Sequence, residues 1–283
     1  MKFTLNIKGR LAVYDKPAVM GIINVTPDSF YAESRKSGAE IAATALEMLG
    51  HGAEILDLGA YSSRPGADDV SPLEEMSRLR KAMKEIRAVA PEAIVSVDTF
   101  RADVARMSVE ELGADIINDI SGGLLDDNMI TTVADLRVPY ILMHTRGTPA
   151  TMQQMCEYPH GITAGVIKEL SERIELAAGA GICDIIVDPG FGFAKTVEQN
   201  YQLLSDLPLL DKAFGRPLLV GISRKSMLTK PLGITPADAL PATVAVNAIA
   251  LEKGASIIRV HDVEAARQCV QVFNLTHSHS KTI

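Results

Sequence analysis

The chain has 283 residues, of which 47% are hydrophobic and 22% are charged, a composition typical of a globular protein with a large core. Its formal net charge is −7 and it contains no basic run, so we expect no nucleic-acid partner bound through phosphate contacts. No apolar run approaches the roughly 18 residues that cross a bilayer, so we expect no membrane partner either.

The cysteines and the N-terminal segment predict the cellular compartment. Cys156, Cys183 and Cys269 are odd in number, far apart and in no CxxC spacing, which favours reduced structural thiols. Residues 1–6 contain no apolar core of the kind that a signal peptide has. We therefore expect a cytoplasmic protein.

The first predicted element is a β-hairpin. Apolar residues alternate within 3–7 and again within 11–13, on either side of a possible turn at residues 8–10 (Lys-Gly-Arg). We expect this hairpin to precede the first buried strand and to close the bottom of a barrel.

Short apolar runs bounded by polar or turn-forming residues then recur along the chain. Most are apolar along their whole length, as parallel strands covered on both faces should be. The predicted strands are 18–24, 54–59, 94–98, 116–120, 140–144, 184–188, 218–223 and 257–261.

The segments between these strands are predicted to be helices. Residues 71–74 (Ser-Pro-Leu-Glu) form a capping box with proline at the first helical position, and apolar residues at helical spacing follow over 76–86. Residues 235–238 start another helix in the same way. Gly113 and Gly254 lie where helices would end, just before the fourth and eighth strands.

This alternation predicts a single (β/α)8 TIM barrel, a fold that typically takes roughly 250 residues. A doubly wound open sheet is the rival, but it would normally have a glycine-rich loop after its first strand. Residues 24–29 contain no glycine. We expect one barrel domain over 1–275, with the hairpin closing its bottom, and a frayed C-terminal tail over 276–283.

Polar side chains recur where the predicted strands end. Repetition on successive parallel strands places such residues in a ring around one mouth of a barrel, which is where barrel enzymes build their active sites. The residues concerned are Asn24, Asp98, Asn118, Asp119, Asp188, Arg259 and His261.

Asp98, Asn118 and Asp188 allow two interpretations. Taken singly, each could cap the following helix or bond a neighbouring loop. Taken together, two carboxylates and an amide suit a flat heterocycle whose edge is mostly N–H donors, such as a 2-amino-4-oxopyrimidine. Lys225, just after the seventh strand, could donate to a ring carbonyl and keep the carboxylates ionised. The alternative interpretation is that Lys225 belongs to an exposed loop and has no role in a site.

Arg259 and His261 alternate on the eighth strand, so their side chains share a face. A buried arginine needs a compensating partner, and an internal salt bridge to a carboxylate could provide it. We prefer an anion pocket, in which Arg259 and His261 hold phosphate oxygens and Asn24, on the neighbouring first strand, supplies one neutral oxygen to Mg²⁺. A magnesium ion commonly takes only one or two protein ligands besides water and phosphate oxygens. Ser63 and Arg64, in a Pro-Gly turn after the second strand, could also reach an anion or a carboxylate.

The chain closely resembles the dihydropteroate synthase family, the folate-pathway enzymes inhibited by sulfonamides. The resemblance covers nearly the whole chain, and its segments occur in the family's order. They are 21–30 (GIINVTPDSF), 63–67 (SRPGA), 97–99 (VDT), 117–119 (IND), 188–193 (DPGFGF), 223–225 (SRK) and 259–261 (RVH).

The resemblance implies a transferase that condenses 6-hydroxymethyl-7,8-dihydropterin diphosphate with 4-aminobenzoate, giving 7,8-dihydropteroate and diphosphate, with Mg²⁺ as cofactor. It also implies small-molecule substrates and a possible homodimer. The implied roles are pterin binding by Asp98, Asn118, Asp188 and Lys225; Mg²⁺ binding by Asn24; diphosphate binding by Arg259 and His261; and an aminobenzoate side formed by Ser63, Arg64, Pro65, Phe193 and Ser223.

The implied catalytic residues are Asp98, Lys225, Arg259 and His261. Arg259, His261 and Mg²⁺ would stabilise the departing diphosphate, and Asp98 would favour the cationic methylene carbon that remains. No protein nucleophile is required. Ala60-Tyr61, Ser63, Thr145 and the segment 31–35 depart from the family pattern, and we expect them to affect aminobenzoate and sulfonamide binding rather than the reaction.

Two other functions fit less well. A methyltransferase acting on a methylated tetrahydropterin would bind no diphosphate, which leaves Arg259, His261 and Asn24 without a joint role. A barrel that binds pterin without turnover is the other alternative, although every residue named above is chemically competent.

Overall fold

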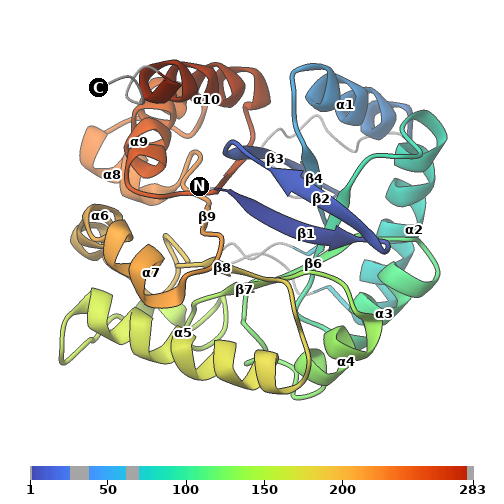
Figure 1. Cartoon of the computed structure of the whole chain (residues 1–283), viewed down its shortest axis with the longest axis horizontal. Coiled ribbons are helices and arrows are strands. Elements are labelled where there is room, and N and C mark those ends of the chain that lie inside the picture. Colours follow the sequence, from blue (N-terminus) through green and yellow to red (C-terminus); the bar gives the residue numbers. More distant parts are fainter. Residues whose placement is uncertain (1, 26–37, 62–69, 279–283) are drawn as a thin grey trace.

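The computed structural model describes residues 2–25, 38–61 and 70–278 (Figure 1). Eight parallel strands form one sheet in the order β8-β7-β6-β5-β4-β3-β10-β9. Each strand lies within a range that the sequence predicts. The strands are β3 (Ala18–Asn24), β4 (Ile55–Gly59), β5 (Val95–Asp98), β6 (Ile116–Asp119), β7 (Tyr140–Met143), β8 (Ile185–Asp188), β9 (Leu219–Val220) and β10 (Ile257–Val260).

The sheet closes on itself between β8 and β9. Val187 of β8 forms a parallel bridge with Leu218, and its N–H donates to the Pro217 carbonyl at 2.9 Å. Because β9 also pairs with β10 on its other side, every strand has two neighbours. The predicted (β/α)8 TIM barrel is confirmed.

The N-terminal hairpin is also confirmed. β1 (Phe3–Ile7) pairs antiparallel with β2 (Arg10–Tyr14), and the turn residues Lys8 and Gly9 have positive φ angles of 50° and 78°. Phe3 and Leu5 are buried in one cluster with the inward side chains near the amino ends of the strands, among them Met20 and Ile55. Figure 1 shows the hairpin lying across this end of the barrel, so it closes the bottom.

Helices surround the barrel, and a larger apolar cluster fills the layer between them and the strands. The α-helices are α1 (Gly38–Gly50), α2 (Pro72–Val89), α3 (Ala102–Glu110), α4 (Met129–Leu136), α5 (Ile162–Gly179), α6 (Val197–Ser205), α7 (Leu207–Phe214), α8 (Ser226–Leu232), α9 (Leu240–Glu252) and α10 (Val263–Ser278). Two short 3-10 helices are η1 (Met152–Gln154) and η2 (Ala237–Ala239).

Helix ends follow the sequence signals closely but not everywhere. Ser71 caps α2, its Oγ accepting from the Glu74 N–H at 3.2 Å, with proline at the start of the helix. The second predicted helix start forms the 3-10 turn η2 before α9. α10 continues to Ser278, so residues 276–278 of the predicted tail are helical, and residues 279–283 lie outside the described part of the chain.

Within the described ranges no single helix is long and apolar enough to cross a bilayer. One pair, Ser226–Leu232 with Ala237–Glu252, reaches that length and composition jointly, with a bend of 98° between its parts.

Candidate active site

The predicted ring of polar residues begins with a row across four adjacent strands. Asn24 of β3 pairs in register with Gly59 of β4, Gly59 with Asp98 of β5, and Asp98 with Asn118 of β6. In-register neighbours on parallel strands point to the same side of the sheet. Three of the predicted site residues are therefore neighbours at the carboxyl end of the barrel.

Asp57 of β4 is a member of the site that the sequence analysis missed. It is fully buried, and its Oδ2 accepts from Arg259 Nε at 2.6 Å and from Asn118 Nδ2 at 3.1 Å. Its sequence signal was an acidic residue between Leu56 and Leu58 inside an apolar strand, two residues before Gly59. A buried carboxylate in such a run requires a cationic or donor partner.

Arg259 links this carboxylate to Asp98. Its Nη2 donates to Asp98 Oδ2 at 3.0 Å, and its side chain is 18% exposed. The internal salt bridge that the sequence left open is therefore present, with one guanidinium between two carboxylates. Burial opposes the charged form of Arg259, but Asp57 and Asp98 together raise its pKa.

The pKa of Asp98 is raised from its ordinary value. Burial is the main cause, Arg259 acts against it, and the negative charges of Asp57, Glu75 and Asp119 add to it. Asp119, the other acidic residue at the end of β6, has a structural role: it accepts from Ser121, Gly123 and the Tyr140 hydroxyl and is fully buried.

Asp188 and Lys225 lie on the other side of the mouth. Asp188 Oδ1 accepts from the Gly190 N–H at 2.7 Å, so the predicted alternative of bonding the following loop is also realised. Burial raises the pKa of Asp188, and the charge of Lys225 opposes this. Burial lowers the pKa of Lys225 to about 8, and Asp188 opposes this in turn. Each of the two groups therefore favours the charged form of the other.

Lys225 is fixed by the loop after β8. Its Nζ donates to the Phe191 carbonyl at 2.6 Å and lies 4.9 Å from the centroid of the Phe193 ring. Phe193, predicted on the aminobenzoate side, is thus adjacent to the predicted pterin lysine.

Ser223 and His261 form a pair. Ser223 Oγ accepts from the His261 backbone N–H at 3.3 Å and lies 3.0 Å from His261 Nδ1. Ser223 is predicted on the aminobenzoate side, but the residue that it contacts is His261, which is predicted to bind the diphosphate.

Asn24 presents an oxygen beside Asp98. A Cβ built on Gly59 would lie 3.3 Å from Asn24 Oδ1 and 3.8 Å from Asp98 Oδ2, so glycine leaves room for both. Within the described ranges no three His, Cys, Asp or Glu side chains gather as a metal site. Mg²⁺ prefers oxygen ligands and often takes one or two from protein, so the donors present fit this ion.

Comparisons with known proteins give the family. A family model described as "Pterin binding enzyme" matches residues 20–261. A dihydropteroate synthase from Synechocystis is 43% identical over 259 residues, which cover 90% of this chain and 88% of that protein. The chain belongs to the dihydropteroate synthase family. Members of this family are transferases of folate synthesis.

Solved structures of dihydropteroate synthases share the fold over nearly the whole chain. The Yersinia pestis enzyme in complex with a sulfonamide drug has a TM-score of 0.90 and 37% identity, covering 98% of this chain and 100% of that one. The Xanthomonas albilineans enzyme in complex with 7,8-dihydropteroate has a TM-score of 0.84 and 35% identity, covering 98% and 99%.

Some relatives are longer than this chain. The folic acid synthesis protein fol1 of Schizosaccharomyces pombe is 41% identical over 261 residues, and the match covers 90% of this chain but 36% of fol1. The folate synthesis bifunctional protein of Arabidopsis thaliana is 40% identical, and the match covers 56% of it. The chain thus spans only part of these relatives.

The remaining predicted residues of the dihydropteroate synthase site lie outside the described part of the chain. They are Ser63, Arg64 and Pro65, in the segment 62–69, and the departures over 31–35 fall in the segment 26–37. Tyr61, which is described, packs its ring edge-on against Phe100 with the centroids 5.0 Å apart.

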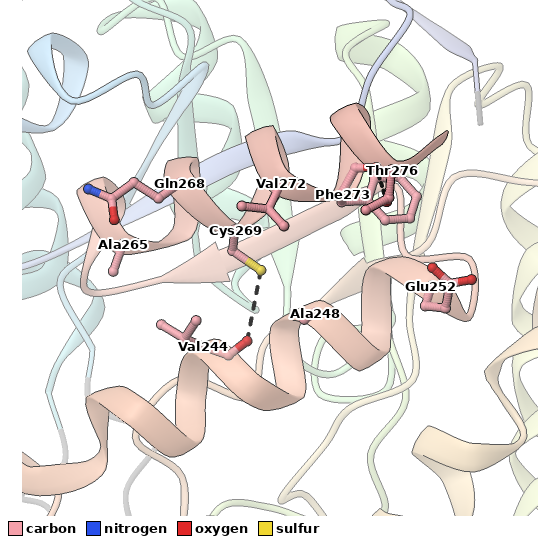
Figure 2. A pocket seen from close by; sticks show the side chains of 9 residues that line it. All are labelled: Val244, Ala248, Glu252, Ala265, Gln268, Cys269, Val272, Phe273 and Thr276. Atoms are coloured by element: carbon pink, nitrogen blue, oxygen red, sulfur yellow. Dashed lines mark hydrogen bonds between the residues drawn. The ribbon is translucent and has the colours of Figure 1, made fainter. Parts of the chain in front are cut away.

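An apolar groove lies outside this site, between α9 and α10 (Figure 2). Val244 and Ala248 line it from α9, and Cys269, Val272 and Phe273 from α10. Cys269 Sγ lies 3.8 Å from the Val244 carbonyl oxygen. The groove contains none of the predicted substrate or metal ligands.

Proposed function

We propose that this chain catalyses the dihydropteroate synthase reaction, joining 6-hydroxymethyl-7,8-dihydropterin diphosphate to 4-aminobenzoate with release of diphosphate. The main support is the cluster at the barrel mouth, where Asp57 and Arg259 connect Asp98 to Asn118. The match to the Xanthomonas albilineans enzyme in complex with 7,8-dihydropteroate, the product of this reaction, also supports it.

The pterin ring would bind to Asp98, Asn118, Asp188 and Lys225. Because Asn118 donates its amide hydrogen to Asp57, its Oδ1 is left as an acceptor for a ring N–H. Asp98 and Asp188 would accept from the amino and ring N–H groups, in charge-assisted hydrogen bonds. Lys225 would donate to the ring carbonyl.

Charge would drive the reaction. Arg259 and His261 would bind the diphosphate and stabilise its negative charge as the C–O bond breaks. The Asp98 carboxylate would stabilise the electron-poor methylene carbon, which is conjugated with the pterin. The arylamine nitrogen of 4-aminobenzoate would then attack that carbon and lose a proton.

We propose Asn24 as the protein ligand of Mg²⁺. The bound ion would supply positive charge to the diphosphate and so make it a better leaving group. Asn24 Oδ1 is a neutral oxygen beside Asp98 Oδ2, and both suit a hard cation.

Ser63, Arg64, Pro65, Phe193 and Ser223 would form the aminobenzoate side, where a sulfonamide would compete. The position of the Phe193 ring beside Lys225 supports this.

We further propose a cytoplasmic homodimer. The free thiols of the three cysteines support the cytoplasmic location. The exposed side chains of Ile249, Val272 and Leu275, which α9 and α10 present beside an apolar groove, support the dimer. Light scattering tests the dimer, with a monomer mass as the contrary result.

Diphosphate release from the purified protein tests the reaction. Dihydropterin diphosphate is supplied with and without 4-aminobenzoate and Mg²⁺, and released diphosphate and dihydropteroate are both measured. We expect release that depends on Mg²⁺ and dihydropteroate when aminobenzoate is present. Tight pterin binding without release would instead support a non-catalytic barrel. Methyl transfer from a methylated tetrahydropterin would support the other enzyme class.

A further inference from the structure

Lys195, a lysine that the reaction above does not use, lies in the loop between β8 and α6 with its side chain buried. It is 3% exposed. Burying an ammonium group is costly unless its charge and its N–H donors are compensated. The partners of Lys195 therefore indicate what it stabilises.

All three ammonium donors of Lys195 have acceptors. Its Nζ lies 2.9 Å from the Gly190 carbonyl, 2.9 Å from the Phe193 carbonyl and 2.9 Å from His144 Nδ1. A lysine ammonium has three N–H donors and no acceptor, so this site uses all of them. Two of the three bonds go to the loop 190–193.

His144 extends the network toward the surface. Since Nδ1 accepts from Lys195, the ring proton is on Nε2, which lies 3.1 Å from Glu169 Oε2. Burial and the charge of Lys195 lower the pKa of His144 to about 4, which keeps the ring neutral. Arg146 pairs with Glu169 and stacks 3.8 Å above the Tyr158 ring, so α5 anchors the network.

The other face of the same loop contacts Lys225. The Phe191 carbonyl accepts from Lys225 Nζ, and the Phe193 ring lies beside that ammonium. A Cβ on Gly190, whose φ is +70°, would lie 1.9 Å from the His144 carbonyl oxygen. The loop is thus closely packed against the His144 segment, with one lysine bonded to it on each side.

We propose that Lys195, supported by His144, is a positioning residue that fixes the loop 190–193 so that the Phe191 carbonyl holds Lys225 in place for the pterin. This inference rests on the pterin role proposed above for Lys225. Lys195 touches no substrate, and its effect on pterin diphosphate binding passes through Lys225.

A double-mutant cycle tests the proposal. Dissociation constants for dihydropterin diphosphate with Mg²⁺ are measured by calorimetry for the wild type, Lys195→Met, Lys225→Ala and the double variant. Burial lowers the pKa of Lys195 to about 7, so the measurements are made at pH 6, where the ammonium is the main form.

We expect Lys195→Met to weaken pterin diphosphate binding about tenfold, and to change it less than about twofold when Lys225 is already alanine, because residues that act through one another are not additive. Lys253→Met is the matched control. Its Nζ donates to the Ser205 carbonyl on the outside of the barrel, and its dissociation constant should equal that of the wild type.

The contrary outcomes separate two failures. Additive losses for Lys195→Met and Lys225→Ala would overturn the positioning role alone. An unchanged dissociation constant for Lys225→Ala would overturn the pterin role of Lys225 together with the inference. A wild-type protein that binds no pterin diphosphate would contradict the proposed function itself.

His144 provides a second test if Lys195→Met fails to fold. Asparagine can place its Oδ1 near the position of His144 Nδ1 and accept from Lys195, whereas leucine cannot. We expect His144→Leu to weaken pterin diphosphate binding about tenfold and His144→Asn to retain most of the affinity. Equal losses in the two variants would overturn the proposal.

Discussion

At the residue scale, the central feature of the site is one guanidinium shared by two carboxylates. Arg259 bonds Asp57 and Asp98, and Asp57 also orients the Asn118 amide. Removing one partner of a buried ion pair leaves the other charge uncompensated, which costs more than the pair contributes. Asp57 is therefore a structural requirement for the arrangement of three proposed ligands.

Asp57→Asn keeps the shape of the side chain and removes its charge. We expect the free energy of unfolding to fall by about 1–3 kcal/mol, the usual cost of an incompletely compensated buried group, as measured by urea denaturation. Glu110→Gln is the control, because it breaks only the exposed pair with Arg106 and should cost less than about 0.5 kcal/mol. Equal losses in the two variants would contradict the structural role of Asp57.

Asn24→Ala removes the proposed protein ligand of Mg²⁺. We expect the Mg²⁺ concentration for half-maximal rate to rise at least about tenfold, since loss of a ligand oxygen weakens a site that has few of them. Gly59→Ala should act in the same direction, because its new Cβ would lie 3.3 Å from Asn24 Oδ1. An unchanged Mg²⁺ titration in Asn24→Ala would remove this residue from the ion's ligands.

At the element scale, the site is built by loops that follow the strands. The loop after β9 contains Arg224, whose φ of 57° is left-handed and whose side chain pairs with Asp262 at the start of α10. The loop after β8 holds Lys225 by its Phe191 carbonyl. Lys225 therefore owes its position to two loops that directly follow strands and are fixed by the Arg224–Asp262 ion pair and the Phe191 carbonyl contact.

Asp98 and Lys225 together predict a bell-shaped pH dependence of kcat/KM for dihydropterin diphosphate, a constant that reports groups of the free enzyme. Activity should rise as Asp98 ionises, at a pH above the ordinary range of a carboxyl because its pKa is raised by burial. It should fall as pH passes about 8, where Lys225 loses its proton. Rate measurements across pH 5–10 check both limbs.

Substitution assigns each limb of that profile. Lys225→Ala should abolish the alkaline fall and weaken pterin diphosphate binding far more than aminobenzoate binding. Asp98→Asn should abolish the acid limb. An alkaline fall that persists unchanged in Lys225→Ala would assign it to another group.

At the scale of the whole molecule, the barrel separates stability from function along its axis. The hairpin and the inward side chains at the amino ends form one apolar cluster, and the polar ligands lie at the carboxyl ends. Substitutions at the bottom should therefore change stability without changing the site.

Leu5→Ala tests this separation. Leu5 is 1% exposed, and we expect its truncation to lower the free energy of unfolding by about 2–5 kcal/mol with KM values unchanged. Leu11→Ala on the same hairpin is the control, because Leu11 is 68% exposed and should cost less than about 0.5 kcal/mol. A raised KM for either substrate in Leu5→Ala, measured where the protein is folded, would show that the ends are coupled.

The sequence by itself determined the strands, the hairpin and the residues at the strand ends. Apolar runs, period-two alternation and turn residues are local signals, and parallel strands necessarily bring their carboxyl ends together. For that reason Asn24, Asp98 and Asn118 could be assigned to one mouth before their distances were known.

Only the tertiary structure decided which of these side chains are partners. Asp57 meets Arg259 across 202 residues, and Lys195 meets His144 across 51. Ser223 contacts His261, and Arg259 forms the internal salt bridge that the sequence left open. Such pairs depend on strand register and barrel closure, which bring distant segments to within hydrogen-bonding distance and leave no periodic signal in the chain.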